Sequence, residues 1–198
     1  MRLVLASQSA SRRAMLEAAG VPFVAEAAAI DETSVKAAML ADRAAPRDIA
    51  DRLAELKAVR VSSVHPDALV LGSDSIVVLA DGTLLDKPES RAQARAHLEA
   101  MANNQVELIS AAVAAEAGRP VWRHVATARL DVRPLSPAFL DDYLDHEWPA
   151  IAGCVGCFRI EARGVQLFTR LGGDHFTILG MPLLPVLDYC RTRGVLAA

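Results

Sequence analysis

The chain has 198 residues, enough for one domain or for one domain with two lobes, and its hydrophobic residues form no run near the roughly 18 that a membrane-spanning helix requires. The net charge is −3 and Lys and Arg are scattered, which argues against binding to a nucleic-acid backbone. The apolar stretch at the start is too short for a signal peptide, and Arg12 and Arg13 follow where such a peptide would be cleaved. The chain has three cysteines, and this odd number argues against a disulfide framework. We therefore expect a soluble protein of the reducing cytoplasm.

The first third of the chain is predicted to contain two strands and two helices. Residues 2–6 form a short apolar strand, the serine-rich loop 7–11 interrupts it, and a helical pattern then continues to Gly20. A second strand is expected over 21–29. A longer helix is expected over 46–63, since Pro46 opens it and apolar residues then recur on one face.

The rest of the chain alternates strands, hairpins and helices. The expected elements are a strand at 68–80, a helix at 89–102, strands at 106–115 and 121–132, a helix from Ser136 to about His146, strands at 157–162 and 165–171, and a helix at 182–193. In the first of these strands, Gly-Ser-Asp-Ser interrupts the apolar residues, and Asp81-Gly82 then predicts a hairpin turn. This order favours an α/β fold in which helices flank a mixed sheet.

Asp74 is the most informative single residue, because it is a carboxylate among apolar strand residues. Burying an unused carboxylate there would be costly. Either Asp74 caps a neighbouring turn through its side chain, or it acts as a metal ligand or a general base. The second interpretation suits a strand that breaks at Gly72, where backbone and ligand could approach closely.

Further residues could hold phosphate groups or a metal ion. The loop from Ser7 to Arg13 offers hydroxyl groups and backbone N–H groups at a helix start, where an anion is favoured. Lys57 and Lys87 are cations that surface positions would also explain, and Asp31 and Glu32 form a short acidic segment. Acids for Mg²⁺ or Mn²⁺ together with cations for phosphates are the parts that phosphoryl chemistry requires.

Several common sites are missing from the sequence. There is no GxxxxGK[ST] loop, no GxSxG elbow, no HExxH and no complete GxGxxG. Cys154 and Cys157 form a single CxxC, with only Cys190 and dispersed histidines as further ligands, so we do not expect zinc or redox chemistry there.

Taken in order, short segments of the chain resemble the Maf family of nucleotide pyrophosphatases. LVLASQSASRRAMLEAAGVPF is similar to the family's N-terminal signature, and Ile30-Asp31-Glu32 is similar to its V-D-E. AELKA, LGSDSIV, DKPES and GGDHFTILGMPL resemble its later blocks. The matches extend from about residue 3 to 187, so the resemblance covers nearly the whole chain.

The resemblance implies a single domain over 1–198 of the inosine-triphosphate-pyrophosphatase type, with a twisted mixed sheet and two lobes around a central cleft. It also implies a homodimer, a divalent cation, and hydrolysis of a nucleoside triphosphate to the monophosphate and pyrophosphate, as house-cleaning of non-standard nucleotides. Asp74 would be the catalytic carboxylate and a metal ligand, and Glu32 would help to bind the metal. The residues that would hold the triphosphate are Ser9, Arg12, Lys57 and Lys87.

The base that the enzyme would recognise is left open. The family's base-contacting positions correspond to Ser11, Ser75 and Glu161 in this chain. The segment from Cys154 to Glu161 resembles the branch that acts on 7-methylguanosine triphosphate, whereas Ser11 and Ser75 match no branch.

Two departures from the family pattern keep another hypothesis open. Asn103-Asn104-Gln105-Val106 replaces a G-[RK]-T-H segment, and Asp86 replaces a glycine. The chain could therefore be a non-catalytic relative that binds nucleotides or regulates cell division. A third hypothesis is a phosphatase acting on a sugar or nucleoside monophosphate.

Overall fold

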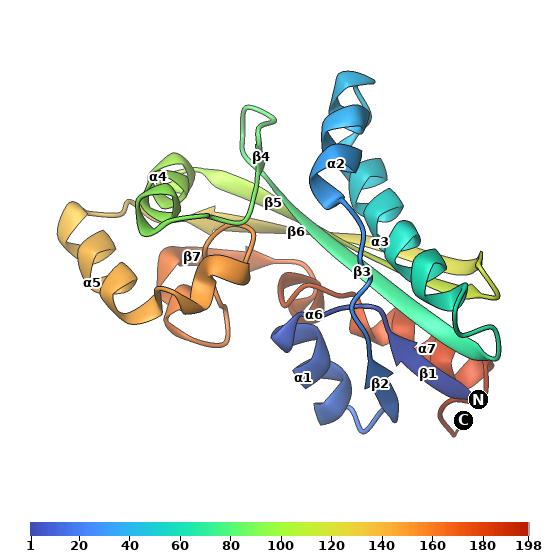
Figure 1. Cartoon of the computed structure of the whole chain (residues 1–198). Coiled ribbons are helices and arrows are strands. Elements are labelled where there is room, and N and C mark those ends of the chain that lie inside the picture. Colours follow the sequence, from blue (N-terminus) through green and yellow to red (C-terminus); the bar gives the residue numbers. More distant parts are fainter. Residues whose placement is uncertain (198) are drawn as a thin grey trace. The chain divides into compact units, whose positions relative to one another are not determined.

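The computed structural model describes residues 1–197, which form two compact units (Figure 1). The first unit contains Met1–Ser75, Ser110–Ala126 and the described chain from Gly180 onward. The second unit contains Ile76–Ile109 and Thr127–Leu179.

Helices and strands alternate along the chain, as the sequence predicts. In order, the elements are β1 (Arg2–Leu5), α1 (Ala10–Ala18), β2 (Phe23–Ala25), α2 (Glu32–Ala41), α3 (Pro46–Ser62), β3 (Ala68–Val78), β4 (Leu84–Leu85), α4 (Arg91–Met101), β5 (Gln105–Glu116), β6 (Arg119–Val132), α5 (Pro137–Glu147), the 3₁₀ helices η1 (Ala150–Gly153) and η2 (Arg163–Leu167), β7 (Phe168–Gly172), α6 (His175–Ile178) and α7 (Leu183–Thr192). The strands are hydrogen-bonded in the order β2-β1-β3-β5-β6-β7, and β4 pairs with β3. Because β1 is parallel to β2 and β3 while β4 and β7 are antiparallel to their neighbours, the sheet is mixed and the predicted α/β class is confirmed.

In the first unit, α3 packs closely against β3. A Cβ atom added to Gly72 would lie 2.2 Å from the carbonyl oxygen of Ala54 and 2.6 Å from the amide nitrogen of Ala58. The glycine therefore permits a close approach of helix and strand. It does not break the strand, because β3 continues from Ala68 to Val78, and the predicted interruption at Gly-Ser-Asp-Ser is wrong.

In the second unit, α4 and α5 cover one face of the sheet. Ala128, Leu130 and Val132 of β6 point into this core and are buried against residues of both helices. The hydroxyl group of Tyr143, in α5, donates a hydrogen bond of 3.0 Å to the carbonyl oxygen of Cys157. Successive strand residues point to opposite faces, so the residues between the buried ones lie on the other, polar face.

Most predicted elements are present, and the loops show the largest differences. The strand expected at 157–162 is absent, because Cys157 has a φ angle of 58° and a turn follows, in which the amide of Ala162 donates a hydrogen bond of 3.1 Å to the carbonyl oxygen of Arg159. The strand expected at 21–29 is limited to Phe23–Ala25. Helix α2 was not predicted, and Asp31 begins it as the N-cap instead of lying in a loop.

The turn after β3 follows its sequence signal, and a second tight turn joins β5 to β6. Asp81 accepts a hydrogen bond of 2.9 Å from the amide of Thr83 in the turn between β3 and β4. Ala117 and Gly118 join β5 to β6 with positive φ angles at both residues, as a tight hairpin turn requires. No helix within residues 1–197 is both long enough and apolar enough to cross a membrane.

Candidate active site

Three charged side chains of the first unit meet at Lys57. Its ammonium nitrogen lies 2.6 Å from Oδ1 of Asp74 and 2.9 Å from Oε1 of Glu32. The side chains of Lys57 and Asp74 are only 8% and 10% exposed, whereas that of Glu32 is 39% exposed. The pair is therefore almost buried, and Glu32 is its partly exposed partner. We call these three residues the ion triplet.

The close packing at Gly72 explains why the ion triplet forms. Asp74 follows Gly72 by two residues, so both point to the face that α3 covers. Lys57 lies in the helical turn between Ala54 and Ala58, whose backbone atoms contact that glycine. The ammonium group compensates the buried carboxylate, and Asp74 makes this contact from inside β3 rather than capping a turn.

Arg12 lies on the other side of β3 in a buried hydrogen-bond network. Its Nε donates to the carbonyl oxygen of Gly180 at 2.8 Å, and Nη2 donates to Oγ of Ser75 at 2.9 Å. A longer contact of 3.5 Å joins Nη1 to Oγ of Ser7. Burial lowers the pKa of Arg12, and the charges of nearby Asp74 and Glu32 oppose this shift. The guanidinium is thus a cation held in place by these hydrogen bonds, and it interacts electrostatically with Asp74 and Glu32.

The serine loop caps helix α1. Ser9 is the N-cap, and its Oγ accepts a hydrogen bond of 3.4 Å from the amide of Arg12. The amide of Ser9 donates to Oγ of Ser7 at 3.2 Å. Ser11, half-buried, lies in the first turn of the helix. The serine-rich sequence therefore has a structural role here, which leaves its predicted role in phosphate binding as a prediction.

The structure adds three residues that sequence reasoning missed: Ser73, Ser110 and Gly180. The carbonyl oxygen of Gly180 accepts bonds from Oγ of Ser73 at 3.2 Å and Oγ of Ser75 at 3.1 Å, as well as from Arg12. Oγ of Ser75 also lies 2.9 Å from Oγ of Ser110. The signal was available in part, because Ser73 and Ser75 flank Asp74 in the strand and had to face away from it. Their distant partner could not be inferred.

The remaining predicted site residues belong to the second unit. Lys87 and Glu161 are both exposed. Their charges act in opposite directions on the thiol of Cys154, since Glu161 raises its pKa and Lys87 lowers it. Burial raises the pKa of Cys154 and raises that of Cys157 to about 12, which keeps both thiols protonated at neutral pH. Protonated thiols are poor nucleophiles and poor metal ligands.

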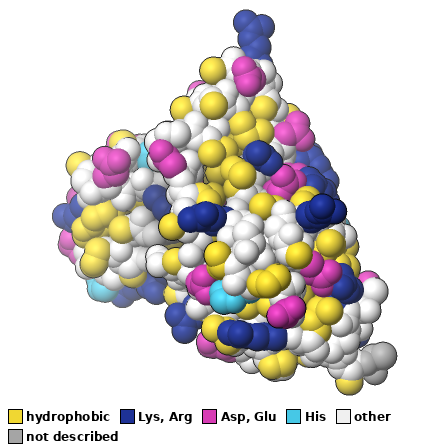
Figure 2. Space-filling view, turned by 45° about the vertical axis from the view of Figure 1, so that its right-hand side comes forward, with side chains coloured by type: hydrophobic (Ala, Val, Ile, Leu, Met, Phe, Trp, Pro, Cys, Tyr) yellow, Lys and Arg dark blue, Asp and Glu magenta, His cyan; other side chains and the backbone are white. Residues whose placement is uncertain are grey.

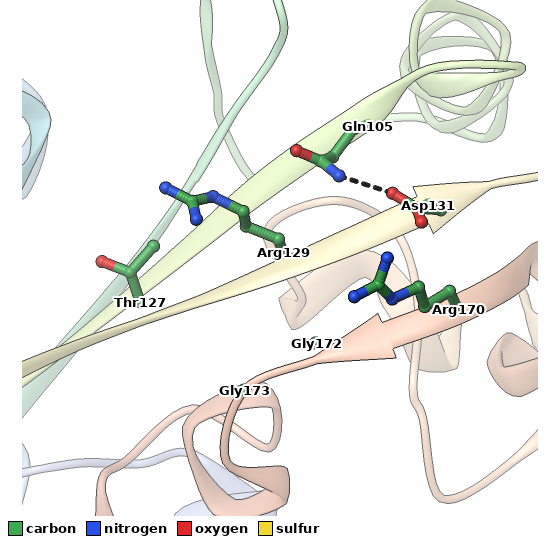
Figure 3. A pocket seen from close by; sticks show the side chains of 7 residues that line it. All are labelled: Gln105, Thr127, Arg129, Asp131, Arg170, Gly172 and Gly173. Carbon is green, nitrogen blue, oxygen red and sulfur yellow. Dashed lines mark hydrogen bonds between the residues drawn. The ribbon is translucent and has the colours of Figure 1, made fainter.

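A surface cavity of about 360 Å³ lies on the polar face of the second unit (Figure 3). Its lining residues are Gln105, Thr127, Arg129, Asp131, Arg170, Gly172 and Gly173. Nε2 of Gln105 donates to Oδ1 of Asp131 at 2.7 Å, and Nε of Arg129 donates to Oε1 of Glu107 at 3.0 Å. None of the predicted site residues lines this cavity.

The charged side chains on the face drawn in Figure 2 are mixed. Lys and Arg side chains alternate there with Asp and Glu side chains among the described residues. A protein that binds the phosphate backbone of a nucleic acid usually carries a continuous stripe of Lys and Arg side chains on its surface. The described part of this face has no such stripe.

Glu32 and Asp74 are the side chains best placed to hold a divalent cation. In residues 1–197 no three His, Cys, Asp or Glu side chains come together as a complete metal site. Mg²⁺ is usually held by only one or two protein carboxylates and takes its other ligands from substrate phosphates and water. Two carboxylates around one ammonium group fit that ligand set.

Almost the whole chain is similar to known proteins of one family. A family model described as Maf-like protein matches residues 2–193. A protein of Sphingopyxis alaskensis named nucleoside triphosphate pyrophosphatase is 49% identical over 195 residues, which cover 98% of this chain and 98% of that protein. A protein of Caulobacter vibrioides with the same name is 47% identical over 194 residues, covering 98% of this chain and 96% of that protein.

Two solved structures are also similar. One is a HAM1 protein from Coxiella burnetii, with 14% identity, a TM-score of 0.41, and coverage of 67% of this chain and 73% of that chain. The other is a nucleoside-triphosphatase, dITP/XTP pyrophosphatase, from Mycobacterium abscessus, with 18% identity, a TM-score of 0.40, and coverage of 68% and 74%.

Proposed function

Because this chain belongs to the Maf-like protein family, we propose that it hydrolyses a nucleoside triphosphate to the monophosphate and pyrophosphate, with residues 1–198 acting as one domain. One structural observation carries this proposal. The ion triplet combines a buried carboxylate, a buried ammonium group and a half-exposed second carboxylate. Phosphoryl chemistry uses such groups to orient water and to compensate the charge of phosphates.

In the proposed reaction, Asp74 acts on the attacking water. Its carboxylate orients a water molecule toward the α-phosphorus and accepts the proton that the water loses. The new bond joins the water oxygen to the α-phosphorus, and the bond from that phosphorus to the oxygen bridging the α- and β-phosphates breaks. Pyrophosphate then leaves with the bridging oxygen. Lys57 holds the Asp74 carboxylate in place through their bond of 2.6 Å.

The other proposed substrate contacts follow from charge and position. Lys57 pairs directly with the catalytic carboxylate, and Arg12 interacts with it electrostatically, so both cations would compensate negative charge on the phosphates. Ser9 at the start of α1 and Lys87 in the second unit would bind further phosphate oxygens. Because most of these groups are positively charged, they favour a negatively charged triphosphate over a neutral substrate.

A divalent cation, Mg²⁺ or Mn²⁺, is part of the proposal. Glu32 and Asp74 would hold it together with phosphate oxygens, and it would supply charge compensation for the triphosphate. Asp74 keeps its role in orienting water, and Lys57 keeps the two carboxylates close to each other.

The identity of the base is proposed from three positions. Ser11, Ser75 and Glu161 would contact it, and the segment that contains Glu161 favours a modified purine such as 7-methylguanine. In the structure, Ser75 accepts a hydrogen bond from Arg12, so a base that contacts Ser75 would also affect the position of that cation. We further propose a homodimer in the cytoplasm, where a reducing environment suits three free cysteines.

The non-catalytic alternative is not favoured. Relatives named as pyrophosphatases cover 97–98% of the chain at 47–49% identity. The chain also contains a buried carboxylate that is paired with a lysine, and this lysine pairs in turn with the partly exposed Glu32.

A panel of nucleotides tests the proposal. Purified protein is incubated with Mg²⁺ or Mn²⁺ and with standard and methylated nucleoside triphosphates, and the products are identified. We expect pyrophosphate and the monophosphate, loss of activity with EDTA, and a decrease of about 10²- to 10⁴-fold in kcat for Asp74→Asn. The matched control is Asp67→Asn, an exposed aspartate of the same unit, which should retain full activity. Equal activity of Asp74→Asn and wild type would refute the site, and orthophosphate as the product would favour a phosphatase instead.

A further inference from the structure

The carbonyl oxygen of Gly180 accepts hydrogen bonds from three side chains of the first unit. Nε of Arg12 donates to it at 2.8 Å, Oγ of Ser75 at 3.1 Å and Oγ of Ser73 at 3.2 Å. Oγ of Ser110, a fully buried residue, lies 2.9 Å from Oγ of Ser75. These five residues come from all three chain segments that make up the first unit. The proposed reaction gives no role to Gly180 or Ser110.

The backbone of Gly180 has a conformation that favours glycine. Its φ angle is +109°, in a region that other residues rarely adopt. A Cβ atom added there would lie 3.4 Å from Oγ of Ser75 and 3.7 Å from Nε of Arg12, which are ordinary contact distances. A side chain would therefore fit in the available space. Glycine is required for the backbone angle, and with this angle the carbonyl oxygen of Gly180 points at Arg12.

All three groups that accept hydrogen bonds from the Arg12 guanidinium are neutral. They are the carbonyl group of Gly180 and the hydroxyl groups of Ser75 and Ser7. By contrast, Arg123 of the same unit bonds to two carboxylates. A bonded carboxylate compensates the charge of an arginine, whereas neutral acceptors fix the direction of the guanidinium and leave its net charge in place. Arg12 is thus oriented without being neutralised.

Arg12 is linked to the catalytic carboxylate within the first unit. Its Nη2 donates at 2.9 Å to Oγ of Ser75, the residue that directly follows Asp74 in β3. A guanidinium group has five N–H donors and its three bonds use three of them, so two remain for a ligand.

We propose that Gly180 is a positioning residue of the proposed reaction. Its carbonyl oxygen holds the Arg12 guanidinium in the orientation in which the remaining N–H groups bind a phosphate oxygen of the triphosphate. Ser110 is a second positioning residue, which acts on Arg12 through Ser75. The inference rests on the pyrophosphatase function proposed above and adds two residues that support its substrate site without touching substrate.

The physical argument depends on preorganisation. An arginine that is not held by other groups loses rotamer freedom when it binds a ligand, whereas Arg12 has already lost this freedom through its bonds to Gly180 and Ser75. The planar guanidinium matches the geometry of phosphate oxygens. A positive charge in a largely buried position also attracts a phosphate more strongly than the same charge in water. Arg12 therefore binds a phosphate best when Gly180 keeps its present conformation.

The first test changes the backbone at Gly180. Gly180→Ala forces the φ angle away from +109° and so turns the carbonyl oxygen away from Arg12. We expect KM for the preferred triphosphate to rise about 10- to 100-fold, with a smaller change in kcat, because the phosphate contact already exists in the bound substrate. The matched control is Gly194→Ala, a glycine of the same unit with a φ angle of +67° and nothing within 4 Å of an added Cβ atom. Its KM should equal that of the wild type.

The second test leaves the backbone unchanged. Ser110→Ala removes the hydroxyl group that contacts Ser75, and KM should rise about 3- to 10-fold. In an Arg12→Ala background, neither Gly180→Ala nor Ser110→Ala should raise KM further, because the side chain that they position is then absent. Thermal unfolding shows which variants are folded at the assay temperature. If Gly180→Ala does not fold, Ser110→Ala decides the question. Equal increases of KM in both backgrounds would overturn the inference.

Binding of inorganic tripolyphosphate with Mg²⁺, measured by calorimetry, is independent of turnover and of the base. Its Kd should rise about tenfold in Arg12→Ala and in Gly180→Ala, and about threefold in Ser110→Ala. A wild type that releases pyrophosphate, with KM and Kd unchanged in the Gly180 and Ser110 variants, refutes this inference and leaves the proposed function in place. A wild type that releases no pyrophosphate, while the same variants weaken tripolyphosphate binding as expected, refutes only the proposed reaction.

Discussion

Gly72→Ala tests whether the close packing of α3 on β3 maintains the ion triplet. The added methyl group would lie 2.2 Å from the carbonyl oxygen of Ala54 and 2.6 Å from the amide nitrogen of Ala58. Both contacts involve helix backbone, which cannot rotate away as a side chain can. Since ordinary contacts of a Cβ atom begin near 3.4 Å, the helix backbone must retreat by about 1 Å.

The expected loss of stability follows from two opposing effects. Overpacking of this kind costs about 1–3 kcal/mol, and a contact with helix backbone belongs at the upper end of that range. Replacing glycine by alanine also reduces the conformational entropy of the unfolded chain, which stabilises the folded protein by about 0.4–1 kcal/mol. We therefore expect a net loss of about 2–2.6 kcal/mol, which lowers the Tm by about 4–10 °C for a chain of this length.

The same displacement should reduce activity more than stability alone would. Lys57 lies in the helical turn that must move away, whereas Asp74 lies on the strand β3, which keeps its position in the sheet. The distance between the two side chains should therefore change. A misplacement of about 1 Å between reacting or positioning groups can cost on the order of 100-fold in rate. We expect kcat/KM to fall about 10- to 100-fold at a temperature where the variant is fully folded.

Thermal unfolding and steady-state kinetics check both expectations. Gly153→Ala is the matched control, because a Cβ atom added there meets nothing within 4 Å. Its Tm and kcat/KM should equal those of the wild type. A Gly72→Ala variant with wild-type Tm and kcat/KM would show that the contact between α3 and β3 does not maintain the ion triplet.

Two other predictions concern charged groups. Lys57→Met removes the ammonium group that pairs with the buried Asp74 carboxylate, and we expect it to lower the Tm by on the order of 10 °C. The double variant Lys57→Met/Asp74→Asn should recover most of this loss, because both charges are then absent. A double variant with a Tm as low as that of Lys57→Met would contradict this account. Burial lowers the pKa of His97, so below its ordinary pKa of about 6.5 the unfolded chain binds the proton first and folding stability falls as the pH decreases. His97→Asn should therefore lose less Tm than wild type between pH 7 and pH 5, and identical pH profiles would contradict the prediction.

Local sequence patterns predicted most of the secondary structure. Pro46 and the apolar residues of one face define α3, which begins at Pro46 and ends one residue before the predicted limit. Ser136 caps α5 by accepting a hydrogen bond of 3.2 Å from the amide of Phe139, as its position before Pro137 indicates. These features depend on residues within one or two turns of each other, so the sequence contains the information needed to predict them.

The prediction was less successful where distant contacts override local preference. The segment at 157–162 has strand-like residues, but Cys157 accepts a hydrogen bond from Tyr143 at its carbonyl oxygen and has a positive φ angle. The sequence predicts a break in the strand at Gly72, whereas this glycine permits the close approach of helix α3. In both cases the decisive partner lies in another element, which a local pattern cannot show.

The candidate site also has features that the sequence predicts and features that depend on distant contacts. The sequence by itself determined the residue types, a carboxylate within an apolar strand, a lysine on an apolar helix and a serine-rich helix start, and through their order it determined the family. Only the tertiary structure decided that Lys57 bonds to Asp74 across 17 residues, that Arg12 bonds to Gly180 across 168 residues, and that Ser75 holds Arg12. The physical reason is that a residue's chemistry and local conformation depend on its neighbours in the chain, whereas the compensation of a buried charge depends on which faces of helix and sheet pack together.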